Sequence, residues 1–337
     1  MTIPVNRSHE AAYAGVGTYC KAPLALRPED LDGVDVAVLG APFDEGVSYR
    51  PGARFGPRSI RQACNYLWSP PARPHMNLGV DPFAVLSVAD YGDAECPPAD
   101  LAGAHREVKA RLGEILDAGA FPVVLGGDHS LAYPDVTAVV ERFGAGNVGL
   151  IQFDAHADTA AGASADGQFA APHGTGMRRL VEEGHVRGEH FIQIGLHGYF
   201  PDPEDFDWAR SVGMRWHTRY EIDCRGMPAV VDELIETAAR DLPEHIFVSF
   251  DIDVFDPGFA PGTGAPEPGG LTPREVLPAL NRIFAELPVV GMDLVEVAPT
   301  YDNPSGITSL LAHRCVLESL AGLALRRSGR EPRPQVS

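Results

Sequence analysis

Four short runs of Asp and His constrain this chain more than any other feature. They lie at residues 126–130 (GGDHS), 154–158 (DAHAD), 173–174 (HG) and 249–257 (SFDIDVFDP), each just after a run of apolar residues. Parallel strands buried on both faces read as continuous apolar runs, and ligands of such sheets bind beyond the carboxyl ends of the strands. The pattern therefore predicts a parallel sheet with a cluster of metal-binding side chains along its carboxyl edge.

Apolar runs of strand type alternate with helical patterns along the chain, which predicts an α/β protein, one three-layer domain with a largely parallel sheet. The predicted strands are 34–39, 84–88, 121–125, 148–153, 191–194, 214–217, 246–250 and 289–294. The predicted helices are 98–118, 131–143, 176–183, 228–240, 272–286 and 307–326. We expect residues 1–33 to be an N-terminal extension that packs on the domain or on a neighbouring subunit, 34–326 to be the single domain, and 327–337 to be a flexible tail.

Composition excludes several classes of partner. The net charge of −19 over 337 residues disfavours nucleic acid and anionic membranes and favours cationic ligands. No apolar run approaches the ~20 residues that span a bilayer, and the N-terminus lacks the apolar segment of a secretory signal. We therefore expect a cytoplasmic protein with no nucleic acid and no membrane partner. The cysteines are scattered without CxxC spacing, which is typical of reduced structural thiols; they are Cys20, Cys64, Cys96, Cys224 and Cys315.

The DAHAD run indicates a metal site by its spacing. Extended backbone places residues i, i+2 and i+4 on one side, so Asp154, His156 and Asp158 converge, and the intervening alanines leave room for a cluster. Asp251 and Asp253 repeat this arrangement after the strand at 246–250. Two carboxylates this close repel each other, and a divalent cation removes that repulsion.

The GGDHS run supplies one more nitrogen ligand, His129, whose ring Asp128 or a backbone carbonyl would orient. Imidazole and carboxylate ligands together suit Mn²⁺, Zn²⁺, Co²⁺, Fe²⁺ or Ni²⁺ better than Ca²⁺. Two His and four Asp are too many for one metal that keeps an open position. We therefore expect two metals that share bridging carboxylates.

Six motifs, in order, resemble those of the ureohydrolase family, which includes arginases, agmatinases and guanidino-acid hydrolases. They are SYRPGARFGPRSIR, GGDHS, FDAHAD, SFDIDVFDP, GFAPGTGAPEPGGLT and MDLVEVAPTYD. The resemblance extends from about residue 34 to residue 325 and looks most like the agmatinase-like branch. It implies an arginase-like fold, with an eight-stranded, mostly parallel sheet between helices, and a homo-oligomer that is a trimer or a hexamer.

The same resemblance implies roles for single residues. The implied ligands of one Mn²⁺ are His129, Asp154, Asp158 and Asp251, and those of the second are Asp154, His156, Asp251 and Asp253. His173 matches the family's proton-shuttling histidine, Glu296 matches the carboxylate that receives the guanidinium, and Asp158 would pass a proton to the leaving nitrogen. From the residues alone, Glu296 could instead be a salt-bridge partner and His173 a loop histidine, and the spacing also allows Ni²⁺, Co²⁺ or Zn²⁺.

The implied reaction is hydrolysis of a small cationic guanidino substrate to urea and an amine. Residues 159–172 are dominated by small side chains and lack the Asn- and Ser/Thr-rich loop of arginases, so arginine is disfavoured. We expect agmatine, which would give putrescine and place the chain in polyamine metabolism. The alternatives are a guanidino-acid hydrolase, acting on 4-guanidinobutyrate or 3-guanidinopropionate, and an amidinohydrolase acting on a larger guanidino natural product.

Overall fold

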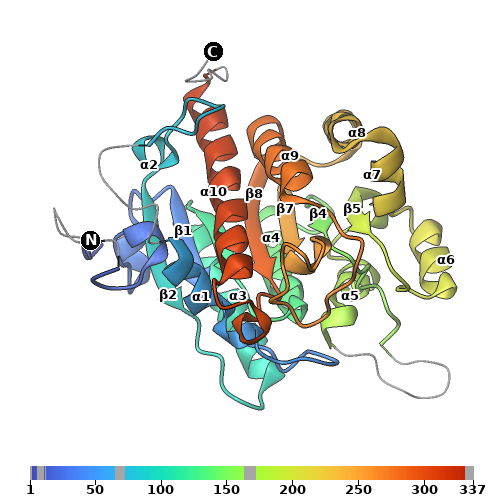
Figure 1. Cartoon of the computed structure of the whole chain (residues 1–337), viewed down its shortest axis with the longest axis horizontal. Coiled ribbons are helices and arrows are strands. Elements are labelled where there is room, and N and C mark those ends of the chain that lie inside the picture. The colour runs from blue at the N-terminus through green and yellow to red at the C-terminus, as the bar shows by residue number, and fades with distance from the viewer. Residues whose placement is uncertain (1, 6–10, 12, 65–72, 163–171, 331–337) are drawn as a thin grey trace.

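An eight-stranded sheet forms the middle layer of the molecule in the computed structural model, which describes residues 2–5, 11, 13–64, 73–162 and 172–330 (Figure 1). The strand order is β2-β1-β3-β8-β7-β4-β5-β6, and every neighbouring pair is parallel. Helices cover both faces, which confirms the predicted three-layer α/β/α architecture. The strands are β1 Val36–Gly40, β2 Val88–Asp93, β3 Phe121–Leu125, β4 Gly149–Phe153, β5 Phe191–Leu196, β6 Arg215–Thr218, β7 Ile246–Asp251 and β8 Val289–Val295.

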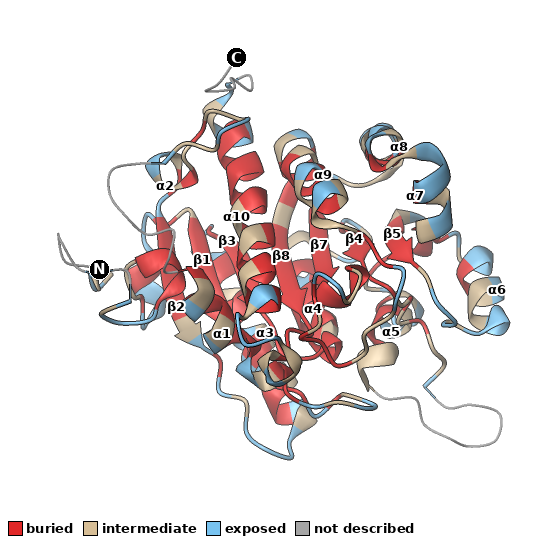
Figure 2. Cartoon of the chain, viewed as in Figure 1, coloured by how far each residue is buried: buried red, intermediate tan, exposed pale blue. Residues whose placement is uncertain are grey.

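The helices form the two outer layers. They are α1 Gly56–Ala63, α2 Pro82–Val85, α3 Leu101–Asp117, α4 Ala132–Phe143, α5 Gly176–Glu182, α6 Pro203–Ser211, α7 Arg219–Arg225, α8 Met227–Asp241, α9 Pro273–Glu286 and α10 Ile307–Ser328. One apolar core lies between the sheet and α1, α8, α9 and α10, and a second lies between the sheet and α3, α4 and α5. The strands are buried almost throughout (Figure 2), which accounts for their continuous apolar runs.

The strand predicted at 84–88 is wrong in position. Asp81 accepts a hydrogen bond from the backbone N–H of Phe83, and Pro82 occupies the first turn, so a short helix forms where a strand was expected. Strand β2 begins only at Val88. Helices α1, α6 and α7 were not predicted, because few apolar residues stand among their polar and charged ones and no clear apolar period emerges.

Helix α10 is the one described helix that is long and apolar enough to cross a membrane by length and composition. However, 78% of its most apolar window is buried inside the fold, as in the core helix of a globular domain. The segment before β1 reaches both layers: Tyr19 is buried in the core beside α10, and Leu31 is buried in the core beside α3. Of the predicted flexible tail at 327–337, residues 331–337 lie outside the described part, and α10 extends to Ser328.

Candidate metal centre

The sheet order brings the predicted ligands together. Strands β3, β8, β7 and β4 are consecutive at the centre of the sheet. Their carboxyl ends lead into His129 after β3, Glu296 after β8, Asp251 at the end of β7 and Asp154 after β4. These residues are far apart in the chain yet meet at one edge, because parallel strands all end on the same side.

A first group of donor atoms surrounds His129, which is 1% exposed. Its Nδ1 atom lies 3.0 Å from Asp154 Oδ2, 2.9 Å from Asp158 Oδ2 and 3.2 Å from Asp251 Oδ2. No well-formed hydrogen bond satisfies this buried nitrogen in the described part of the chain. Three carboxylate oxygens thus lie close to one imidazole nitrogen, as ligands do around a cation.

A second group lies beside the first and shares Asp154. His156 Nδ1 is 3.0 Å from Asp253 Oδ2 and 3.6 Å from Asp154 Oδ1. One oxygen of Asp154 therefore faces the first group and the other faces the second. His129, Asp154 and Asp251 form one set of converging donor atoms, and Asp154, His156 and Asp253 form the other, which fits two cations with a bridging carboxylate.

The charges in this cluster require compensation. Burial raises the pKa of Asp251 well above its usual range, and the neighbouring charges of Asp253 and Asp154 raise it further. Burial also raises the pKa of Asp253 to about 6, against the lowering effect of His156. The ionised forms of such carboxylates destabilise the fold unless a counter-charge is present. Because the donors are carboxylate and imidazole, the residues present fit divalent transition-metal ions.

Backbone strain accompanies this cluster. Asp158 has φ 53° and Glu296 has φ 62°, in the left-handed region that non-glycine residues rarely adopt. Glu296 is fixed by its N–H, which donates to Gly127 O at 2.8 Å, and by its Oε1, which accepts from His129 N at 3.0 Å. A Cβ at Gly127 would lie 1.5 Å from Phe43 O, so only glycine allows this close approach. Strain held by so many contacts is typical of functional sites.

The side chain that contacts the His129 ring differs from the one expected. Asp128 accepts hydrogen bonds from Gly46 N at 2.7 Å and Ser130 N at 2.9 Å, so it does not orient the ring. Instead, His129 Nε2 lies 2.9 Å from Ser249 Oγ, and Ser249 donates to Asp293 Oδ1 at 2.8 Å. Ser249 precedes Asp251 by two residues in β7, so the i, i+2 rule that found Asp251 could also have found it.

Two buried glutamine side chains support the shared carboxylate of Asp154. Gln152 Nε2 donates to Asp154 Oδ2 at 2.6 Å, and Gln193 Nε2 donates to Gln152 Oε1 at 2.7 Å. Both glutamines lie inside otherwise apolar strands and are at most 1% exposed. A polar residue at such a position needs a partner, so two glutamines within apolar runs are the signal in the sequence from which this support could have been predicted.

His173 and Glu296 are paired beside the first group of donors. His173 Nδ1 lies 3.1 Å from Glu296 Oε1, and its Nε2 lies 3.1 Å from Ser48 N and 3.0 Å from Ser48 Oγ. Burial alone would lower the pKa of His173, but the hydrogen bond to Glu296 and its charge outweigh this and raise the pKa to about 9. This places an ionisable imidazole and a carboxylate next to the donor cluster.

Two arginines follow His173 in the sequence, where an unpaired cation would attract an acidic substrate. Arg178 pairs with Glu182 and Asp205, and Arg179 pairs with Glu183, so both cations are already neutralised on α5. The larger part of the loop at 159–172, residues 163–171, lies outside the described residues.

Comparison with known proteins gives a consistent result. The model of the Arginase family matches residues 34–322. The chain is 39% identical to proclavaminate amidinohydrolase of Streptomyces clavuligerus over 89% of this chain and 90% of that protein. It is 37% identical to guanidinobutyrase of Pseudomonas aeruginosa (95% and 96%) and 38% identical to mitochondrial agmatinase of Gallus gallus (95% and 89%). The solved structure of the Streptomyces enzyme superposes with a TM-score of 0.83 at 37% identity, over 94% of this chain and all of that one.

Proposed function

Because this chain belongs to the arginase family and is a hydrolase of guanidino carbon–nitrogen bonds, we propose that it converts agmatine to putrescine and urea. The observation that carries the proposal is the shared carboxylate of Asp154, whose two oxygens face two groups of His and Asp donors beside Glu296. Two cations side by side, next to a buried carboxylate, suit attack of water on a guanidinium.

We assign the ligands as the donor groups suggest. One cation would take His129, Asp154, Asp158 and Asp251. The other would take Asp154, His156 and Asp253, together with Asp251 as the family resemblance implies. We propose Mn²⁺ at both positions, since carboxylate and imidazole donors suit it. When bound, the cations supply Lewis acidity that makes water a competent nucleophile at neutral pH.

Glu296 would bind the guanidinium. Its Oε1 atom already accepts from His129 N and contacts His173, whereas Oε2 borders Gly264. A Cβ at Gly264 would lie 3.3 Å from Oε2 and 2.9 Å from Arg50 O. The missing Cβ therefore keeps space beside Oε2, where guanidinium N–H groups can donate to it. A substrate held there is positioned before it reacts, which replaces diffusion by fixed geometry.

His173 would move protons between the site and solvent. When Nε2 accepts from Ser48 N, the ring proton lies on Nδ1 and faces Glu296. When the ring is doubly protonated, Nε2 can donate to Ser48 Oγ instead. Ser48 is exposed, so these two states connect the buried carboxylate to water. Asp158, held on a strained backbone against His129, would pass a proton to the leaving nitrogen.

An acid at the rim supports agmatine, whose far end is an ammonium. Glu267 lies against the segment that follows β5, since a Cβ at Gly198 would lie 2.7 Å from Glu267 Oε2. His197 Nε2 donates to the backbone carbonyl of Glu267 at 3.0 Å, and His197 N donates to Ala155 O at 3.0 Å, so Glu267 lies near the segment that holds His156. Glu267 carries a carboxylate with no ion pair among the described residues, and the net charge of −19 favours a cation as well.

A second candidate, a guanidino acid, is favoured by Arg50. Its guanidinium stacks over the rings of Tyr49 and Tyr301, 4.9 Å and 5.3 Å from their centroids, and forms no ion pair with any described carboxylate. Its backbone oxygen borders the same glycine as Glu296. A substrate carboxylate could pair with this cation.

Urea release across agmatine, 4-guanidinobutyrate, 3-guanidinopropionate, arginine and a bulky guanidino compound tests the choice. We expect agmatine to have the highest kcat/KM, and Glu267→Gln to raise KM for agmatine about tenfold without that loss for guanidinobutyrate. Arg50→Met is the matched variant and should spare agmatine. If a guanidino acid is preferred and Arg50→Met removes that preference, the second candidate replaces the first.

The proposal also covers the assembly and the location of the enzyme. We propose a homo-oligomer, a trimer or a hexamer, that acts in the cytoplasm, as the family resemblance implies. Residues 1–33 would pack on the domain or on a neighbouring subunit, and residues beyond α10 would form a tail. Light scattering of the purified chain tests the assembly, and a monomer with full activity would remove this part of the proposal.

A further inference from the structure

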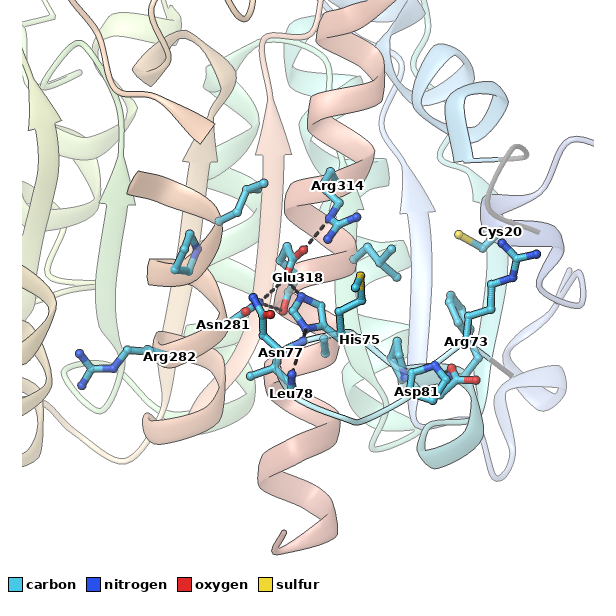
Figure 3. A pocket seen from close by; sticks show the side chains of 18 of the residues that line it. Cys20, Arg73, His75, Asn77, Leu78, Asp81, Asn281, Arg282, Arg314 and Glu318 are labelled. Carbon is cyan, nitrogen blue, oxygen red and sulfur yellow. Dashed lines mark hydrogen bonds and ion pairs between the residues drawn. The ribbon is translucent and has the colours of Figure 1, made fainter. Parts of the chain in front are cut away.

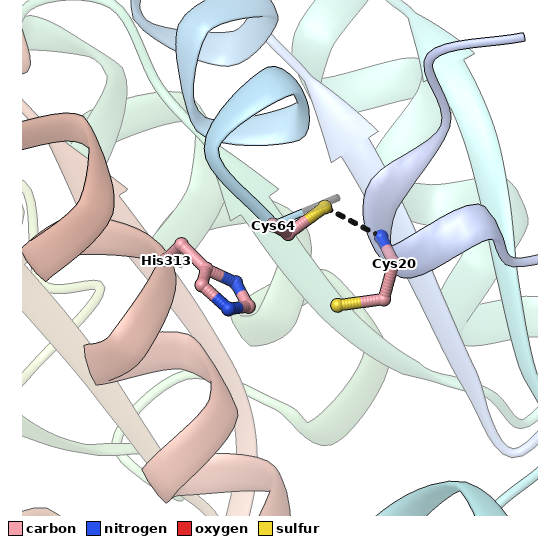
Figure 4. Close-up of side chains that lie close together, drawn as sticks. All are labelled: Cys20, Cys64 and His313. Carbon is pink, nitrogen blue, oxygen red and sulfur yellow. Dashed lines mark hydrogen bonds between the residues drawn. The ribbon is translucent and has the colours of Figure 1, made fainter. Parts of the chain in front are cut away.

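The His129, Asp154, His156, Asp158, Asp251 and Asp253 side chains are called the acidic centre below. A second buried cluster consists of Cys20, Cys64 and His313 (Figure 4). We propose that these three residues form a separate binding site for a thiophilic cation, with Zn²⁺ as the ion it takes. This thiol cluster uses none of the residues assigned above to guanidine hydrolysis.

The donor atoms of the thiol cluster already converge. Cys20 comes from the segment before β1, Cys64 directly follows α1, and His313 comes from α10, yet their donor atoms all lie within 4.8 Å of one another. The three side chains turn toward one another in Figure 4. Zinc–sulfur and zinc–nitrogen bonds of about 2.3 Å and 2.0 Å require tetrahedral donors about 3.5–3.8 Å apart. Small side-chain movements therefore close the site.

The backbone at Cys20 is held in an unfavourable conformation. Cys20 and Lys21 have φ 46° and 56°, two consecutive non-glycine residues in the left-handed region. The turn is fixed by Tyr19 N, which donates to Asp90 Oδ2 at 2.7 Å, and by Cys20 N, which donates to Cys64 Sγ at 2.7 Å. Strain of this kind persists where the surroundings over-determine it, often at ligand sites, and the same strain marks Asp158 and Glu296 at the acidic centre.

Tyr19 offers the imidazole an oxygen partner on Nδ1. The Tyr19 hydroxyl lies 3.3 Å from His313 O, to which it can donate, and 3.2 Å from His313 Nδ1. With the hydroxyl proton on the carbonyl, Nδ1–H donates to the tyrosine oxygen, and Nε2 is then the ring atom that would bind the ion. An oxygen partner on one ring nitrogen and a lone pair on the other is the usual state of a metal-binding histidine.

A cavity gives an ion access to the cluster. Cys20 is on the wall of a cavity of about 1170 Å³ that α2, α9 and α10 border (Figure 3). The cavity also leaves room for a water molecule as the fourth ligand of a tetrahedral ion. Four arginines line it together with Asp81 and Glu318, and ion pairs with Asp232 and Glu318 neutralise two of them, Arg282 and Arg314; the other two are Arg73 and Arg274.

Charge and donor softness both favour zinc here. Binding releases the two thiol protons, and two thiolates then balance the two positive charges of the ion. The occupied site is neutral, which suits residues that are at most 4% exposed. Thiolates favour Zn²⁺ over Mn²⁺, whereas carboxylates suit Mn²⁺. The thiol cluster should therefore take Zn²⁺ and leave Mn²⁺ unbound.

Cadmium provides a direct test, because thiolate-to-cadmium charge transfer absorbs in the ultraviolet and the acidic centre, without sulfur, gives no such band. We expect one Cd²⁺ per Mn²⁺-loaded chain to produce this band, and Zn²⁺ to displace it. Cys64→Ser should lose the band, and Cys224→Ser, at an exposed cysteine on α7, should keep it. No band in the wild type, or an equal band in Cys64→Ser, would overturn the proposal.

Alkylation of the unaltered chain gives a second test that does not depend on folding of a variant. Mass spectrometry of peptides should show that Zn²⁺ slows iodoacetamide labelling of Cys20 and Cys64 about tenfold or more, with Cys224 unchanged. Equal labelling with and without Zn²⁺ contradicts the site. A Cys20–Cys64 disulfide that forms in air despite saturating Zn²⁺ also contradicts it and identifies a redox pair instead.

Discussion

The acidic centre and the thiol cluster are both buried and both rest on strained backbone, but they are built in opposite ways. Ligands of the acidic centre follow adjacent strands at every-other-residue spacing, so local geometry brings most of them together. The thiol cluster joins Cys20, Cys64 and His313, which share no local pattern. A site carried by strand ends can therefore be predicted from a sequence, whereas one assembled from three segments far apart in the chain cannot.

The two clusters also differ in electrostatics. Asp251 and Asp253 keep like charges together in a buried place, and their raised pKa values mean that their ionised forms oppose folding without cations. Neutral thiols and a neutral imidazole do not, and without an ion they pack as ordinary core side chains. Substitutions in and around the two clusters test this difference in electrostatics. The largest effect is expected at the acidic centre.

Asp251→Asn should change activity and stability in opposite directions. We expect agmatine hydrolysis to fall about 10⁴-fold, since Asp251 is a proposed ligand of both cations. Because the pKa of this acid is raised in the folded state, its charge destabilises the fold at neutral pH, and removing it should stabilise the metal-free chain. Steady-state rates and thermal unfolding in EDTA measure the two effects.

Asp256→Asn is the matched control for that variant. Backbone N–H groups of Gly258 and Gly269 donate to Asp256 at 2.8 Å and lower its pKa, so this carboxylate stabilises the fold. We expect Asp256→Asn to lower stability in EDTA. A shift of the same sign in both variants would refute the contrast between the two carboxylates.

Asp90→Asn should weaken the contacts that hold the turn at Cys20 in the thiol cluster. Asp90 accepts from Tyr19 N and from Arg61 Nε at 2.8 Å, and Arg61 is 6% exposed. Leaving this guanidinium without its main counter-charge should cost about 3 kcal/mol in the free energy of unfolding, measured by urea denaturation. Asp93→Asn, at the half-exposed second partner, should cost under about 1 kcal/mol. Equal losses would show that Asp90 has no special role.

His105 gives a baseline for a buried imidazole that belongs to neither cluster. Burial lowers its pKa to about 4, and its Nε2 lies 3.1 Å from Ser130 Oγ. The unfolded chain binds this proton near pH 6.5 and the folded chain does not, so stability is lost as pH falls below 6.5. We expect this residue to contribute about 2 kcal/mol of loss between pH 7 and pH 5. The difference in that loss between wild type and His105→Gln measures it, and parallel pH profiles would contradict the assignment.

Ala99→Gly tests strain outside both clusters. Ala99 is exposed and has φ 59°, the remaining non-glycine residue with positive φ among those described. Glycine relieves this conformation, so we expect a gain of about 0.5 kcal/mol in thermal stability with no change in activity. Ala102→Gly, in the first turn of α3, should instead lose up to about 1 kcal/mol. A loss at position 99 as well would show that this conformation is not strained.

Much of the fold could be predicted from the chain, and the failures have physical causes. Strand β3 was found at its observed limits, because continuous apolar runs are typical of buried parallel strands. The strand at 84–88 was misplaced because a local cap at Asp81 prevailed over the apolar character of Phe83 and Val85. Strand order, which places β8 between β3 and β7, depends on packing between distant segments.

The acidic residues at the strand ends follow from the sequence, since spacing along one strand fixes which side chains share a side. Packing of distant segments was needed to bring Ser249, not Asp128, to the His129 ring and to turn Asp154 toward two groups at once. It alone brought Cys20 and Cys64 to His313. The physical reason is range: backbone geometry acts over a few residues, whereas contacts between layers depend on how the whole core packs.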